Sequence, residues 1–200
     1  MQFSIILFAV VLALTSHTTA SALITPATAS VSQLDNWKVT NVKVQSPSNF
    51  PGRYPWATIS AKVKDPNRYN LGVGNNGRSV IVSARKKAVK CEAKINIAND
   101  KNFLHRAWPC DRVKDGYWTM QIIPSFESKG KYVFTYDDFI LRFTHVASKL
   151  YKGVDPLKLV AEGHFDQQHN TKQTGCKHEH ICNWRLSLKK WEIIPSVGYI

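Results

Sequence analysis

Apolar side chains recur at every second position along most of this chain, and this period of two constrains its fold more than any other feature. The pattern, with polar residues at the alternate positions, covers residues 57–63, 89–97, 118–122, 139–143, 157–161 and 184–188. Successive side chains of a β-strand point to opposite faces, so each segment predicts a strand with one buried face.

Short turn signals separate these runs. They are Asp65-Pro66-Asn67, Gly74-Asn75-Asn76-Gly77, Lys129-Gly130-Lys131 and Asp155-Pro156. Roughly eight to ten strands with short connections, and no amphipathic helical pattern, are typical of antiparallel barrels and sandwiches. The sequence therefore predicts an all-β fold, a single-domain antiparallel β-barrel or sandwich.

The first 22 residues differ from the rest of the chain. An apolar stretch from Phe3 to Leu14 precedes small residues that include Ala20 and Ala22, as in a signal peptide cleaved after Ala22. We expect a signal peptide at 1–22, a flexible tail at 23–34, and a β-barrel domain at 35–200. No apolar run is long enough to cross a bilayer, so we expect a secreted, extracellular protein without a membrane span.

Four cysteines remain after such a cleavage: Cys91, Cys110, Cys176 and Cys182. An oxidising compartment favours two disulfides, but four cysteines allow three connectivities and the sequence does not choose among them. Sequence proximity favours Cys91 with Cys110 and Cys176 with Cys182, two local bridges that we expect to staple hairpins.

Several of these features occur together. They are a strand from Trp37 to Val44, a second strand ending at Asp65-Pro66, the Cys91 strand, Trp108-Pro109-Cys110-Asp111 followed by Tyr117-Trp118, a strand from Phe139 to His145, and the close pair Cys176 and Cys182. This pattern resembles the fungal secreted β-barrel family typified by the major allergen of Alternaria. The resemblance implies two local disulfides and a non-enzymatic, effector-like or allergen-like role. The type member's extra N-terminal cysteine is missing here, so no covalent dimer is expected.

The basic surplus is the strongest indication of a partner. The chain has a formal net charge of +13, and four cations lie within six residues: Arg85, Lys86, Lys87 and Lys90. Such a patch attracts polyanions, among them RNA and acidic polysaccharide. The alternative is a solvated turn that keeps the protein soluble.

Glu162 and His164 are the alternative, catalytic candidates. They lie two apart on an expected strand and therefore on one face. With a cation such as Arg142, or a second imidazole such as His145, they would suit a metal-free ribonuclease. Arg142 and His145 point to opposite faces, so at most one could join. His145 also shares a face with Phe139 to Phe143, which favours a satisfied core histidine.

A weak metal candidate combines His169, His178 and His180, an all-nitrogen set suited to zinc or copper. A solvated polar loop is the favoured interpretation of this segment. No nucleotide, dinucleotide or serine-hydrolase motif occurs, and no cofactor is expected.

The sequence thus favours a secreted, non-enzymatic binding protein of a fungus, effector-like or allergen-like, that acts at a host surface or in the apoplast. Its expected partners are a host extracellular protein or a polyanion. The alternatives are a secreted ribonuclease-like enzyme and a polyanion- or wall-binding protein that uses the Arg85–Lys90 patch.

Overall fold

The computed structural model describes residues 34–48, 50, 53–100, 102–126, 132–150, 152–176 and 180–198. The expected signal peptide and residues 23–33 of the expected tail lie outside these ranges. Within them, no helix is long and apolar enough to cross a membrane.

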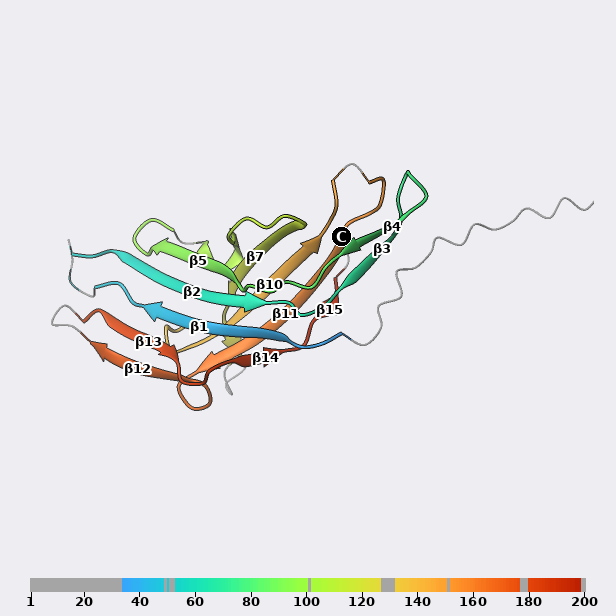
Figure 1. Cartoon of the computed structure of the whole chain (residues 1–200). Coiled ribbons are helices and arrows are strands. Elements are labelled where there is room, and N and C mark those ends of the chain that lie inside the picture. The colour runs from blue at the N-terminus through green and yellow to red at the C-terminus, as the bar shows by residue number, and fades with distance from the viewer. Residues whose placement is uncertain are drawn as a thin grey trace, which may run out of the picture.

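Two antiparallel sheets form the fold (Figure 1). The first sheet has the order β12-β13-β1-β2-β5, and β14 pairs with the other half of β1. Its strands are β1 (Trp37–Gln45), β2 (Trp56–Lys64), β5 (Val89–Asn96), β12 (Thr171–Cys176), β13 (Cys182–Leu186) and β14 (Trp191–Ile193). The second sheet has the order β15-β11-β10-β7-β6. Its strands are β6 (Ala107–Pro109), β7 (Gly116–Ile123), β10 (Asp138–Ala147), β11 (Leu157–Asp166) and β15 (Ser196–Val197).

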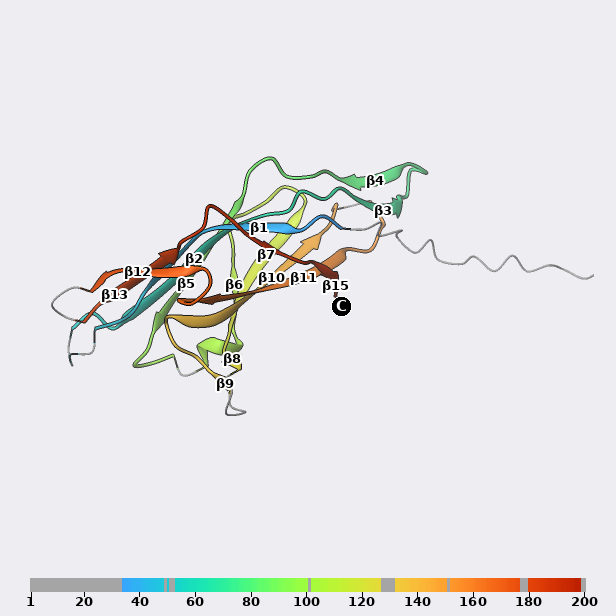
Figure 2. The same ribbon diagram turned by 90° about the horizontal axis from the view of Figure 1, so that it is seen from below.

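Two small hairpins complete the described fold. The first joins β3 (Tyr69–Val73) to β4 (Ser79–Val82), and the second joins β8 (Ser125–Phe126) to β9 (Tyr132–Val133). A 3-10 turn, Phe103–His105, precedes β6. The β3–β4 hairpin projects beyond the two sheets in both views (Figure 2).

The core lies between the two sheets and confirms the alternating pattern. Ala57, Ile59 and Val63 of β2 are buried in one cluster with Phe139 and Leu141 of β10. The alternation ends early at two places, because Ile97 and Leu188 lie beyond β5 and β13 and are exposed. The two sheets do not close into a barrel, so of the two expected architectures the structure selects the sandwich.

A bulge in β1 controls which side chains reach the outer surface. The register with β2 shifts between Thr40 and Lys43, and Asn41 adopts a left-handed φ of 53° that asparagine tolerates better than most residues. The extra residue lets both Val39 and Val42 face the core. Lys43 is then returned to the outer face of the first sheet.

Both local disulfides are present: Cys91 with Cys110, and Cys176 with Cys182. The second ties the β12–β13 hairpin, as expected. The first does not staple a hairpin, because the chain leaves the first sheet after β5 and enters the second at β6. Cys91–Cys110 therefore joins the edges of the two sheets, and beside it the Asp111 N–H donates to the Lys90 carbonyl at 2.8 Å.

We expect removal of the bridge between the sheets to cost more stability than removal of the hairpin bridge. The two pairs lie 19 and 6 residues apart. In the chain-entropy account, loops of these lengths correspond to about 3 and about 2 kcal/mol. Urea unfolding of Cys91→Ser/Cys110→Ser and of Cys176→Ser/Cys182→Ser measures both losses. A larger loss for the hairpin pair would contradict this assignment.

Candidate functional site

The outer face of the first sheet carries most of the exposed cations of its strands. Alternation turns the apolar residues of β1, β2 and β5 inward and leaves their polar neighbours outside. The strand registers place all of these neighbours on one surface. We call this surface the basic sheet face, and its cations are Lys38, Lys43, Lys62, Lys64, Lys90, Lys94, Lys172 and Arg185. Facing the same way are two carboxylates, Glu92 and Glu192.

Three of these cations lie side by side on adjacent strands. Arg185 on β13 is the cross-strand partner of both Lys43 on β1 and Lys172 on β12. Like charges directly opposite each other are destabilising. Among the described residues, none of the three forms an ion pair. We call Lys43, Lys172 and Arg185 the cation row.

Two other cations of the face, Lys90 and Lys94, contact neighbouring side chains. Lys90 pairs with Glu92 at 2.6 Å, and the hydrogen bond and charge of Glu92 raise the pKa of Lys90. The Lys94 ammonium lies 5.0 Å from the centre of the Trp56 ring. Lys38, Lys62 and Lys64 form no ion pair among the described residues either, and the cation row is the part of this unneutralised charge that crosses three adjacent strands.

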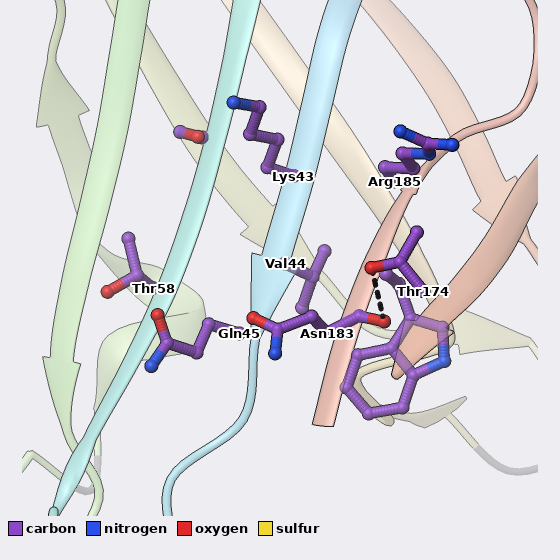
Figure 3. A pocket seen from close by; sticks show the side chains of 9 residues that line it. Lys43, Val44, Gln45, Thr58, Thr174, Asn183 and Arg185 are labelled. Carbon is purple, nitrogen blue, oxygen red and sulfur yellow. Dashed lines mark hydrogen bonds between the residues drawn. The ribbon is translucent and has the colours of Figure 1, made fainter. Parts of the chain in front are cut away.

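Two shallow hollows adjoin the cation row and share Lys43 and Arg185. The first, of about 430 Å³, also exposes Gln45, Thr58 and Asn183 (Figure 3). The second, of about 270 Å³, includes all three cations of the row. Figure 3 shows Lys43 and Arg185 on neighbouring strands, with the hydroxyl and amide side chains of Thr58, Gln45 and Asn183 lower in the view. Such a surface can hold a solvated ligand that carries several negative charges.

The sequence did not single out the cation row, because Lys43 lies far along the chain from Lys172 and Arg185. The signal that could have found it is the same period of two, which places lysines at alternate positions of β2 and β5. Joining those lysines to Lys43, Lys172 and Arg185 requires the strand order.

The expected Arg85–Lys90 patch is divided by the fold. Lys90 lies on β5 and faces outward on the basic sheet face. Arg85, Lys86 and Lys87 precede β5 and line a separate hollow. The start of β5 at Val89 separates the two parts.

The structure places the ribonuclease candidates Glu162 and His164 on one face together with Arg142, and it leaves His145 apart from them. Glu162 and His164 lie on the exposed face of β11, where Arg142 donates to Glu162 at 2.6 Å and His164 Nε2 lies 2.6 Å from Asp138. Their side chains are 44% and 49% exposed. His145, by contrast, faces the core from β10, with only 3% of its side chain exposed. Arg142 and His145 are on opposite faces, as expected.

His145 is a hydrogen-bonded core histidine. Its Nδ1 lies 2.9 Å from Asp65 Oδ2, and its ring stacks on Trp118 with centroids 4.3 Å apart. Tyr69 donates to the same carboxylate oxygen at 2.7 Å, while the backbone and side chain of Asn67 donate to Oδ1. Burial, and then the charge of Asp65, raise the pKa of Tyr69 far above its usual range. Tyr69 therefore stays protonated and donates.

The histidines proposed as metal ligands do not form a site in the described part of the chain. His169 Nδ1 lies 2.8 Å from Asp166, where it caps the turn between β11 and β12. Burial alone would raise the pKa of Asp166, but the hydrogen bonds from His169 outweigh it and lower that pKa. The His180 ring lies 5.4 Å from Phe50, and His178 is outside the described residues. No group of three or more metal-ligating side chains occurs among the described residues.

Comparison with known proteins gives no match for this chain. No family model, no curated protein and no solved structure matches it. The resemblance to the Alternaria allergen family therefore stays a prediction from the sequence pattern.

We expect Asp65→Asn to destabilise the fold far more than Glu162→Gln. Four donors converge on the buried Asp65 carboxylate, and an amide would present its own donor to them; breaking such a buried pair costs about 3 kcal/mol or more. The exposed Glu162–Arg142 pair contributes about 1 kcal/mol or less. Urea unfolding compares the two variants. Similar losses would show that Asp65 does not hold the core together.

Proposed function

We propose that this protein is a secreted, non-enzymatic binding protein that attaches to an acidic polysaccharide through the basic sheet face. The observation that carries the proposal is the cation row, three adjacent cations with no ion pair among the described residues. Side chains that repel one another across strands lower stability, and an anionic ligand removes that repulsion.

The spacing of the face suits a linear polymer with regularly placed anionic groups. Neighbouring strands lie about 5 Å apart, and outward side chains recur about every 7 Å along a strand. Lys62 and Lys64 on β2, opposite Lys90 and Lys38, extend the cations beyond the row. A net charge of +13 also speeds the approach of a polyanion.

The side chains around the cation row favour a sugar polymer over RNA. Gln45, Thr58 and Asn183 offer amide and hydroxyl groups that can bind sugar hydroxyls. Single-stranded nucleic acids are held largely by aromatic stacking. Trp56, at the end of the face, already lies against Lys94, and the hollows at the row offer Trp184 alone as an aromatic lining residue.

Other features of the chain support the secreted, non-enzymatic character that we propose. Two disulfides are compatible with an oxidising, extracellular setting. Glu162 and His164 are already paired with Arg142 and Asp138, each at 2.6 Å, which supports a non-enzymatic role over the ribonuclease alternative. An effector-like or allergen-like action at a host surface, with a host extracellular protein as partner, is the wider role that we propose.

We expect Lys43→Ala/Lys172→Ala/Arg185→Ala to weaken binding of a galacturonic acid oligomer about tenfold, since each exposed charge pair contributes up to about 1 kcal/mol. The dependence of affinity on salt should also become shallower, because fewer charges are neutralised. Isothermal titration calorimetry at several salt concentrations measures both quantities.

The matched control is Arg112→Ala/Lys152→Ala/Lys189→Ala, which removes three exposed cations that lie on none of the strands. It should leave most of the affinity intact. An equal loss in both variants would show that net charge, and not the cation row, drives binding. Tighter binding of single-stranded RNA of matched charge would overturn the choice of polysaccharide.

A further inference from the structure

A third hollow, of about 350 Å³, lies beside the segment that joins β4 to β5. Arg85, Lys86 and Lys87 line it, together with His145 and Asp115. Its volume is at the lower end of the range for small-molecule sites, which suits a ligand the size of a monosaccharide. None of these residues belongs to the cation row.

The charges around this hollow favour an anion. Its one lining carboxylate, Asp115, is already paired with Lys149 at 2.6 Å. Arg85, Lys86 and Lys87 form no ion pair within the described residues. The Nε of Arg85 is buried without a hydrogen-bond partner in the same part of the chain. A buried donor of this kind costs stability until an acceptor reaches it.

His145 is the lining residue whose side chain has a fixed orientation. An ionised carboxylate only accepts hydrogen bonds, so Asp65 holds the proton on Nδ1 and orients the ring. The other nitrogen, Nε2, forms no hydrogen bond to the described residues. Trp118 and Tyr69 contact the ring and prevent it from turning.

Asp65 anchors the loop that precedes β5 and also orients His145. The Arg85 N–H donates to the Asp65 carbonyl at 3.3 Å, while the Asp65 side chain holds His145. The Arg85 backbone and the imidazole are therefore positioned before a ligand arrives. Such preorganisation lowers the entropy that binding costs.

We propose that this hollow binds a small polar molecule bearing one anionic group, either a phosphate monoester or a carboxylate. Arg85, Lys86 and Lys87 hold the anionic group, and His145 Nε2 bonds the body of the ligand. The site is separate from the basic sheet face and does not depend on the proposed polysaccharide.

The experiment titrates the mature protein with glucose 6-phosphate, galacturonate and neutral glucose, followed by calorimetry and by the histidine ring signals in NMR. We expect at least one of the two anions to bind with a Kd of about 1 mM or tighter, and glucose not to bind. The ring signals of His145 should shift, while those of the exposed His164 and His169 should not. The stronger of the two anions identifies the ligand class.

Lys86→Ala/Lys87→Ala tests the cations without disturbing the core, because both side chains are exposed. We expect a rise in Kd of about tenfold, because two exposed cations that hold the anionic group are removed. The matched control, Lys43→Ala/Arg185→Ala, should leave this Kd unchanged although it weakens polysaccharide binding.

Three outcomes would overturn the proposal: no binding of either anion, equal binding of glucose, or a loss in the Lys43/Arg185 control as large as that in the Lys86/Lys87 variant. The last result would assign the small anions to the basic sheet face. Failure of the sheet-face experiment alone would leave this proposal standing, because the two variants remove different cations.

Discussion

The hydrogen bond between Asp65 and His145 joins the two sheets inside the core, and much of the structure depends on it. Asp65 follows β2 of the first sheet, whereas His145 lies on β10 of the second. A buried carboxylate without partners would cost several kcal/mol. Asn67, Tyr69 and His145 supply four donors to its two oxygens, so the packing of the sheets must bring these residues together.

Aromatic residues around the Asp65–His145 pair also join the two sheets. Trp37 of β1 lies 4.7 Å from Trp118 of β7, and Trp118 stacks on His145. The Cys91–Cys110 bridge then holds the two sheets together at one edge. The contacts between the sheets thus combine the hydrogen-bonded Asp65 carboxylate, aromatic packing and one disulfide.

The two faces of the first sheet meet opposite requirements. Its inner face is apolar and stabilises the fold, whereas its outer face places Lys38 opposite Lys64, Lys62 opposite Lys90, and Lys43 opposite Arg185. A surface selected for stability alone would alternate the sign of its charges. The apolar core offsets the stability that this repulsion removes. Because the repulsion does not serve stability, we interpret the outer face as a binding surface.

The sequence by itself determined the long alternating strands and their buried faces, because these depend on the period of two. It favoured the local disulfide pairing, because the members of each pair are close in the chain. It also predicted His145 as a core residue, since His145 shares a face with Phe143. The choice of sandwich over barrel came only from the tertiary structure, because it depends on which strand edges pair. The cation row and the Asp65–His145 contact were decided there as well. Asp65 and His145 lie 80 residues apart in the chain, and only the packing of the two sheets brings them together. Lys43 reaches Arg185 and Lys172 only through the strand order of the first sheet.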